Sequence, residues 1–422
     1  MGLLDPLTAV IISFCFLGVL LYKRINLGIT LNATAIVLAL LSLDWTAIPN
    51  IVYKTVDPSE QNGLLTISVV LATFGIMWLS QLYKETGQIN KLSNSLSKLV
   101  KNPKIVLSAL PAVIGFLPVA GGALMSAPIV DSEAEKLKLR PEKKAYVNLW
   151  FRHTIFPVYP ISQVLIVTGA LTGIALFAII LLQIPTVIVM IIIGYLIGFW
   201  KTANPKTEEN HDTKRKNATE LKTFLAAFSP VLVTIIVAVI MDVSDYGFSQ
   251  HGFDVLTATF VGIAVLAAIS RLNFKVFVKP LKSWGIYGIT AAAYGAFLLR
   301  NVMSTAGVSE IFRPLIVNGS VDATVMLTLI PAVLGFLTGS PSGAIAIGAS
   351  IFTGVVTFTP KTAALLYISA YLGYIIAPTH LCFTFTADYF KSPLGKVYKY
   401  VIPSFIITFT AAILVYLLPF SS

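Results

Sequence analysis

The chain has 422 residues, of which 56% are hydrophobic and only 12% charged, and its mean hydropathy is +0.84. Because soluble domains carry about 25% charged residues, this composition excludes an ordinary water-soluble enzyme. The formal net charge of +11 fits the cytoplasmic loops of a membrane protein better than a nucleic-acid partner, since the basic residues gather between apolar runs.

The apolar runs predict an all-α polytopic membrane protein with about ten transmembrane helices and two re-entrant hairpins. The hairpins are expected at 105–130 and 324–352, two apolar stretches that Pro and Gly interrupt midway. Segment 88–100 alternates polar and apolar residues at helical spacing, which is typical of a helix in the membrane interface. The expected spans are residues 7–22, 27–43, 64–83, 144–169, 173–200, 221–242, 254–270, 284–303, 362–386 and 397–418.

The two halves of the chain are similar in sequence. ALPAVIGFL at 109–117 and LIPAVLGFL at 329–337 are offset by 220 residues, and the same offset aligns Gly87 with Gly307. A match at a fixed offset indicates an internal duplication. We therefore expect a first repeat of five spans and one hairpin over 1–200, a linker over 201–220, and a second such repeat over 221–422.

The basic residues predict the orientation of the chain. If each hairpin returns to its own side, 25 of the 30 Lys and Arg residues fall on one face, which the positive-inside rule makes cytoplasmic. That face receives segment 136–144 and the linker 201–220, so both termini are expected outside the cytoplasm, in a protein of the cytoplasmic (plasma) membrane. Because each half has an odd number of spans, the second repeat is inverted, and its hairpin enters from the outside. Inverted repeats with opposed broken helices are typical of secondary transporters, whose substrate binds near the midplane.

The hairpin tips and two broken spans provide candidate backbone ligands. Pro and Gly interrupt the helices at the tips and at 156–163 and 377–380, which leaves amides and carbonyls unpaired. Amides at a helix N-terminus favour an anion and carbonyls at a C-terminus favour a cation, although small residues also serve close helix packing. The residues expected to bind a coupling cation are Val119, Ala120, Gly121, Gly339, Ser340 and Pro378.

Polar side chains beside the breaks complete the candidate site. Arg152 lies about 12 Å along its span from Lys144 at helical rise, a depth at which a charge is usually functional or paired. His153 and His380 each adjoin a break, where a histidine can also be a structural hydrogen-bonding group. The residues expected to bind the substrate are Gly121, Gly122, Asn148, Arg152, His153, Ser162, Gln163, Ser340, Ser342, Gly343, Thr379, His380 and Thr384.

Several motifs are absent from the sequence. No Asp or Glu is expected deep inside a span, which argues against a carboxylate proton relay, whereas sodium held by carbonyl and hydroxyl oxygens needs none. There is no nucleotide-binding P-loop, HExxH or GxSxG motif, and the four histidines form no metal-spaced cluster. Cys15 and Cys382 indicate neither a disulfide framework nor a metal site. We therefore expect no catalytic residue, no cofactor, no nucleic-acid partner and no metal beyond a coupling sodium ion.

Three stretches carry a resemblance to a known family: PAVIGFLPVAGGALMSAPIV at 111–130, NLWFRHTIFPVYPIS at 148–162 and APTHLCFTFTADYF at 377–390. They resemble the domain-of-unknown-function 401 family of the ion-transporter superfamily, related to gluconate permeases and to sodium–dicarboxylate and citrate symporters. The resemblance implies a homodimer in which a mobile transport domain, holding both hairpins, moves as an elevator against a scaffold domain. The Ser-Asn-Thr motifs of the sodium–dicarboxylate relatives are missing here, since the tips read VAGG at 119–122 and GSPS at 339–342.

The sequence therefore predicts an ion-coupled secondary transporter of a small organic anion such as a carboxylate, surrounded by membrane lipid, with sodium as the expected coupling ion. Proton-coupled antiport through His153 or His380 is an alternative. An intramembrane enzyme acting on lipid and a passive channel are two others, but inverted symmetry argues against the enzyme.

Overall fold

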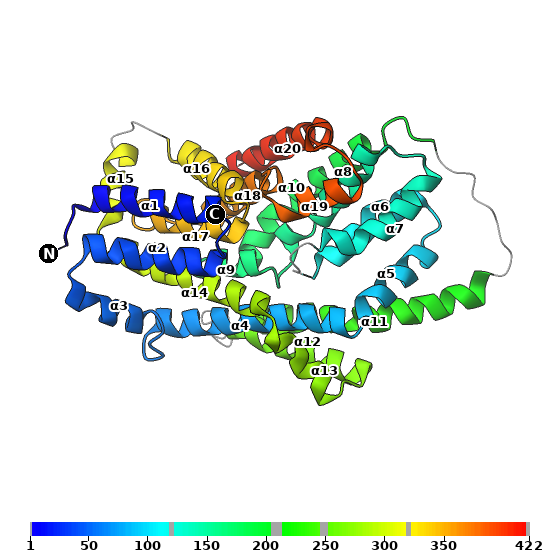
Figure 1. Ribbon diagram of the computed structural model, residues 1–422, viewed down its shortest axis with the longest axis horizontal. Helices are drawn as coiled ribbons and strands as arrows, with labels where there is room; N and C mark the ends of the chain where they lie inside the picture. Colours follow the sequence, from blue (N-terminus) through cyan, green and yellow to red (C-terminus); the bar gives the residue numbers. More distant parts are fainter. Residues whose placement is uncertain (1, 118–121, 204–212, 245–251, 318–321, 419–422) are drawn as a thin grey trace.

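The computed structural model describes residues 2–117, 122–203, 213–244, 252–317 and 322–418 (Figure 1). Over these residues the chain is helical throughout, with turns between the helices and no strand. The predicted all-α class is confirmed. Three of the residues expected to bind ligands, Val119, Ala120 and Gly121, lie outside the described residues.

In the described part of the chain, ten α-helices lie before residue 201 and ten after it, and the first of the second set begins at Thr213, inside the linker expected at 201–220. The first ten are α1 (Pro6–Tyr22), α2 (Leu27–Ser42), α3 (Ile48–Lys54), α4 (Gln61–Glu85), α5 (Gln88–Leu99), α6 (Pro103–Gly115), α7 (Ala123–Lys136), α8 (Pro141–Arg152), α9 (Gln163–Thr172) and α10 (Leu176–Phe199). The others are α11 (Thr213–Val243), α12 (Phe253–Ser270), α13 (Phe274–Val278), α14 (Trp284–Thr305), α15 (Val308–Val317), α16 (Ala323–Thr338), α17 (Pro341–Phe352), α18 (Pro360–Ile375), α19 (Leu381–Tyr389) and α20 (Leu394–Leu417).

The helices of the second half follow the order of the first. Helix α15 begins 220 residues after α5, and each of the two begins directly after a glycine with positive φ, Gly87 (66°) and Gly307 (69°). A positive φ costs glycine little and other residues more, so the glycine at each position favours the turn that precedes the helix. The shared order is what a duplication predicts, and it makes α15 the counterpart of the helix expected at 88–100.

By length and composition, six helical segments of the described chain are long and apolar enough to cross a membrane. They are α4 (Gln61–Glu85), the segment Pro141–Thr172 that contains α8 and α9, α10 (Leu176–Phe199), the part of α11 over Ala218–Val243, α12 (Phe253–Ser270) and α20 (Leu394–Leu417). The other predicted spans differ: α1 and α2 have only 17 and 16 residues, and α14 is not among the six. Span 362–386 is divided into α18 and α19, because Pro378 stands where a continuous helix would need a backbone donor.

The helices form two groups that differ in their neighbours (Figure 1). Helices α1, α2, α4, α5, α11, α12 and α14 pack mainly on one another. The second group holds the two helical hairpins, α6–α7 and α16–α17, together with α8, α9, α10, α18, α19 and α20. The groups meet where α17 contacts α14, where α9 contacts α4 and where α6 contacts α5.

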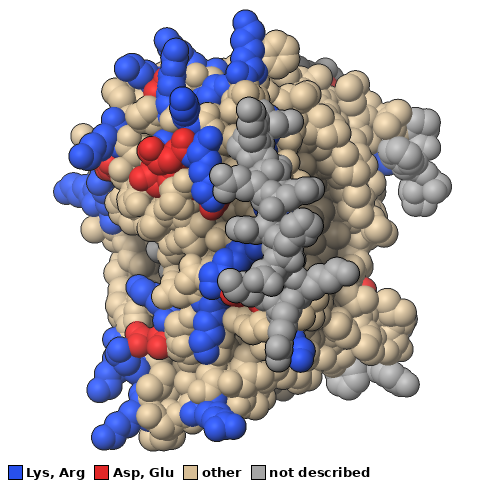
Figure 2. All heavy atoms as spheres, turned by 90° about the vertical axis from the view of Figure 1, so that its right-hand side faces the viewer, with Lys and Arg blue, Asp and Glu red and all other residues tan. Residues whose placement is uncertain are grey.

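Basic side chains gather at one end of the molecule (Figure 2). At the start of α6, Lys104 Nζ donates to the carbonyl of Thr202 at 2.8 Å, and at the start of α8, Lys143 Nζ donates to the carbonyl of Trp200 at 3.0 Å. The starts of α6 and α8 therefore both lie beside residues 200–202, where the linker begins. This arrangement requires the α6–α7 hairpin to return to the end at which it starts.

Candidate functional site

The two broken spans meet in the second helix group. His153 caps the C-terminus of α8, and His380 caps the N-terminus of α19. Both are buried, at 1% exposure, and their rings lie 4.8 Å apart at an angle of 89°. Tyr374, near the end of α18, packs against His380 with the ring centroids 3.9 Å apart and the planes tilted by 40°, and its hydroxyl lies 3.5 Å from His153 Nε2. The fold thus brings together two histidines that are far apart in the sequence.

Backbone carbonyls fix how the two rings face each other. His153 Nδ1 lies 2.7 Å from the Leu149 carbonyl oxygen, and His380 Nδ1 lies 3.4 Å from that of Ile375. Because a carbonyl can only accept, we assign the proton of each neutral ring to Nδ1, which leaves Nε2 as an acceptor. His380 Nε2 has no hydrogen-bond partner among the described residues.

Arg152 places a charge in the interior next to the histidine pair. Its side chain is 1% exposed, and Nη2 donates to the Leu117 carbonyl at the end of the first hairpin arm, at 3.1 Å. Nε and Nη1 have no partner within the part of the chain that the structure describes, and no described carboxylate pairs with this guanidinium. Arginine stays protonated in proteins, so the site contains a buried cation with donors to spare.

Close packing holds the first hairpin against Arg152. A Cβ on Gly115, the last residue of α6, would lie 2.5 Å from the Arg152 carbonyl oxygen and 2.9 Å from Ile155. Only a residue without a side chain allows this approach. The absence of a side chain at Gly115 therefore lets the Leu117 carbonyl reach the guanidinium.

Asn148 lies one turn before Arg152 on α8, and its amide is already used by the protein. Its Oδ1 accepts from Ser126 Oγ at 2.5 Å, while Nδ2 donates to the Ala123 carbonyl at 2.9 Å and lies 3.4 Å from Thr386 Oγ1. These bonds tie α8 to α7 and α19. Asn148 therefore joins three elements of the site, and Gly122, the buried N-cap of α7, lies at the same junction.

The tip of the second hairpin touches the break between α18 and α19. Gly339 ends α16 with φ of 58°, and a Cβ there would lie 2.4 Å from Thr379 Oγ1. Ser340 caps α17 by accepting from the Gly343 amide at 3.3 Å. A Cβ on Gly343 would lie 3.1 Å from Leu27 of α2, so this tip also reaches the first helix group.

The remaining expected residues are less closely gathered. Ser162, the N-cap of α9, is buried, and its hydroxyl is near that of Tyr367, although neither has a hydrogen bond of ordinary geometry. Thr384 donates within α19 to the Leu381 carbonyl at 3.2 Å. The other residues are partly open to the surface: Gln163 and Ser342 are half-buried, and Pro378 and Thr379 are exposed.

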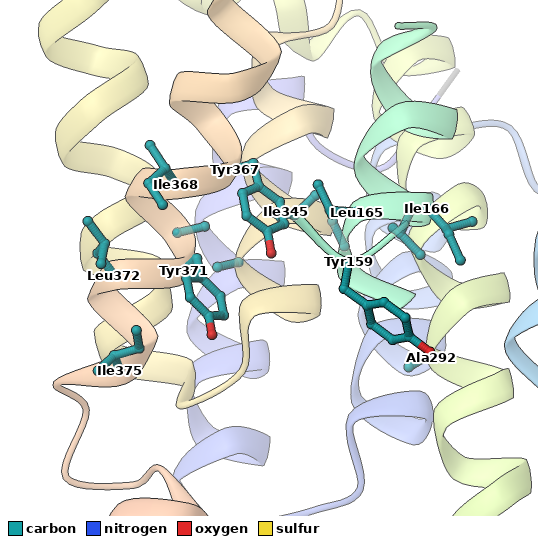
Figure 3. Close-up of a cluster of buried hydrophobic side chains, with 14 of the residues drawn as sticks. Tyr159, Leu165, Ile166, Ala292, Ile345, Tyr367, Ile368, Tyr371, Leu372 and Ile375 are labelled. Atoms are coloured by element: carbon teal, nitrogen blue, oxygen red, sulfur yellow. The ribbon is translucent and has the colours of Figure 1, made fainter. Parts of the chain in front are cut away.

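A row of tyrosines on α18 belongs to the site and is not among the expected residues. Tyr367, Tyr371 and Tyr374 follow one another at the spacing of one helix face, with the first two rings stacked at 5.7 Å. Tyr371 donates to the His153 carbonyl at 2.7 Å. Figure 3 shows Tyr367 and Tyr371 pointing from α18 toward α9, with Leu372 on the other side of the helix. The spacing of these three tyrosines can be read from the sequence. That Cys382 lies beside both histidines is shown only by the structure.

The sequence matches the family described as "Protein of unknown function (DUF401)" over residues 7–418. Among solved structures, the fold is similar to that of the YdaH transporter of Alcanivorax borkumensis, which is described as having an unusual topology. The two chains are 16% identical, and the match covers 89% of each with a TM-score of 0.62. At this identity the likeness shows the fold alone. No curated protein matches the chain.

Proposed function

The chain belongs to the DUF401 family and has the fold of a membrane transporter, and from this premise we propose that it is an ion-coupled secondary transporter of a small organic anion. The observation that carries the proposal is Arg152, which is buried and has two guanidinium nitrogens without partners among the described residues. Moving a charge from water into the protein interior costs about several kcal/mol, even after the surroundings relax, unless the charge is paired. A bound carboxylate would supply that pair and accept two parallel hydrogen bonds in the fork geometry that arginine favours, one from a free nitrogen and one from the second N–H of Nη2.

The proposed substrate site lies where both halves of the chain contribute. Arg152 and the first hairpin come from one half, and His380 with the Gly339–Thr379 contact comes from the other. The amides of Gly121, Gly122 and Ser342 would add donors to the anion, and the Gly343 amide would join them only by giving up its bond to Ser340 Oγ. For the coupling ion, sodium, we propose the carbonyls expected from the sequence, those of Val119, Ala120, Gly121, Gly339, Ser340 and Pro378. The Ser340 carbonyl would first have to release the Thr338 hydroxyl at 2.9 Å and the Ala344 amide at 3.1 Å.

Alternating access would be a movement of one helix group against the other, which is the elevator mechanism. The proposed scaffold is the group around α4, α12 and α14, and the proposed transport domain is the group with the hairpins. A cavity of about 200 Å³ lies at their boundary and is lined by Leu65, Gly173 and Asp254 among others. Incomplete packing at this boundary supports a sliding surface. We further propose a homodimer in the plasma membrane, with inverted repeats over 1–200 and 221–422 and the linker 201–220 in the cytoplasm.

Proton-coupled antiport is a second candidate, because the histidine pair is present. His153 and His380 are 4.8 Å apart and both have a free or weakly engaged Nε2. A proton on either ring would be close enough to disfavour a second one on its neighbour. One proton carried by the histidines in each cycle would then replace sodium as the coupling ion.

Anion binding can be tested on the purified protein by thermal unfolding against a panel of carboxylates, with and without sodium. A ligand at 100 times its Kd stabilises the protein by about 2.7 kcal/mol, so the midpoint should rise for a true substrate. Arg152→Gln should lose this rise, and Arg152→Lys should keep only part of it, because an ammonium cannot make the bidentate contact. Arg300→Gln is the matched control, since Arg300 is half-buried on α14 in the other helix group. An undiminished shift in Arg152→Gln would end the proposal.

A further inference from the structure

A third chemical group completes the histidine pair. Cys382, the second residue of α19, is buried at 7% exposure. One ligand atom from each of His153, His380 and Cys382 lies within 4.8 Å of the other two. Imidazole nitrogen and thiolate sulfur are the preferred ligands of zinc and other borderline or soft metal ions.

The carbonyl contacts present both rings as metal ligands do. Histidines that bind metals donate their other ring N–H to a carboxylate, carbonyl or water, which fixes the tautomer and the orientation of the ring. Here the Leu149 carbonyl contacts His153 Nδ1 at 2.7 Å, and the Ile375 carbonyl contacts His380 Nδ1 at 3.4 Å. Nε2 is then left to bind: on His380 it has no partner in the described chain, and on His153 a metal ion would replace the Tyr374 hydroxyl at 3.5 Å.

From this geometry we infer that His153, His380 and Cys382 form a site for a single Zn²⁺-like cation that links α8 to α19. Bonds of 2.0–2.3 Å in tetrahedral geometry separate neighbouring ligand atoms by about 3.3–3.6 Å. The ligand atoms would have to approach by roughly 1 Å from their present limit of 4.8 Å, a shift divided among three side chains. The Cys382 thiol gives up its proton to solvent when the thiolate binds the metal.

The metal would act as a clamp between the two breaks. Three protein ligands leave a fourth coordination position for water or an anion. With one thiolate and two neutral imidazoles, the bound cation keeps one net positive charge next to Arg152, so the fourth ligand is expected to be anionic. The clamp would hold α8 of the first half against α19 of the second and restrict their relative movement. This inference does not depend on the proposed transport activity.

Cobalt(II) is the probe for the test, because a thiolate bound to it gives a charge-transfer absorption that no oxygen or nitrogen ligand gives. The full-length protein carrying Cys15→Ser, which removes the exposed second thiol, should bind one Co²⁺ with this absorption and release it to Zn²⁺. Cys382→Ser should abolish the absorption and weaken binding by more than the 10–100-fold that loss of an outer partner costs. His153→Gln and His380→Gln should each weaken binding to a similar extent.

Two further measurements keep the inference testable if a variant fails to fold. Zn²⁺, and not Mg²⁺, should slow alkylation of Cys382 in the Cys15→Ser protein, and Tyr374→Phe should retain that protection because its hydroxyl is not a ligand. Cobalt binding without the thiolate absorption, or alkylation that is indifferent to Zn²⁺, would overturn the inference. Carboxylate-induced stabilisation of protein kept in chelator tests the transport proposal separately, so the two can fail independently.

Discussion

Replacing Arg152 by methionine is expected to stabilise the ligand-free protein and at the same time to remove its affinity for anions. The guanidinium is 1% exposed, makes one hydrogen bond at 3.1 Å and has no carboxylate partner in the described chain. Replacing buried ionic groups by apolar residues of similar volume is often neutral or stabilises proteins by about 1–4 kcal/mol. The buried Leu117 carbonyl, left without this donor, offsets about 1–3 kcal/mol of this. The middle of the two ranges gives a small net gain of roughly 0.5 kcal/mol.

Asn148, one helical turn away, provides a matched comparison of opposite sign. All of its amide groups face partners in α7 and α19. Asn148→Leu would remove its bonds to the Ser126 hydroxyl and the Ala123 carbonyl, each worth about 0.5–1.5 kcal/mol, although the Ser126 hydroxyl would still donate to the Ala123 carbonyl at 3.1 Å. Arg152→Met should therefore raise the unfolding midpoint, whereas Asn148→Leu should lower it by several degrees.

Thermal unfolding in detergent, with and without a carboxylate that stabilises the wild type, measures both effects in one series. Arg152→Met should begin from a higher midpoint and show no further rise with the ligand. Removal of one partner from a buried ion pair destabilises by about 3–5 kcal/mol. A fall of that size in Arg152→Met would mean that the guanidinium is paired within the protein, and the reasoning from an unsatisfied charge would then be refuted.

Three other predictions concern the hairpin, the coupling ion and the topology. Gly339→Ala should destabilise the protein by at least about 1–2 kcal/mol, because φ is 58° and the new Cβ would lie 2.4 Å from Thr379 Oγ1. Adding Thr379→Ala should recover part of this loss. If the unfolding free energies of the two substitutions were strictly additive, the contact between the two residues would be contradicted. Uptake into proteoliposomes should require a sodium gradient and survive collapse of the pH gradient; equal uptake driven by protons alone would favour the histidine antiport. Accessibility tags in 136–144 and in the linker 201–220 should be modified from the same side of the membrane, and labelling from opposite sides would rule out inverted repeats.

The class of the fold and the places where its helices break could be predicted from the sequence. Proline and glycine have local effects, so Pro157, Pro160 and Pro378 mark the interruptions of the fourth and ninth spans that the structure has. The expected family is confirmed by the match over residues 7–418. The count of ten spans is not matched by helix length alone, because α1 and α2 are shorter than a typical spanning helix.

The partners of the site residues could not be predicted in the same way. The histidines showed no metal spacing along the chain, yet His153 and His380 are in contact because α8 and α19 pack together. Asn148 was expected to bind substrate, and only the structure shows that Ser126 and Ala123 occupy its amide. Such contacts depend on how distant helices cross, a property that no local pattern in the sequence specifies.

The pairing of α8 with α19 has a consequence for how the protein is made. About 230 residues separate Arg152 from His380, and a ribosome that adds about 5–20 residues per second takes roughly 12–46 s to synthesise them. During that time His153 has entered its helix end while α18 and α19, which bring the Tyr371 hydroxyl to its carbonyl and the His380 ring beside its own, do not yet exist. The insertion machinery or lipid headgroups must therefore accommodate this polar group until the last quarter of the chain arrives. A first half produced alone would keep it without those partners permanently, so its rapid degradation in cells is the expected fate.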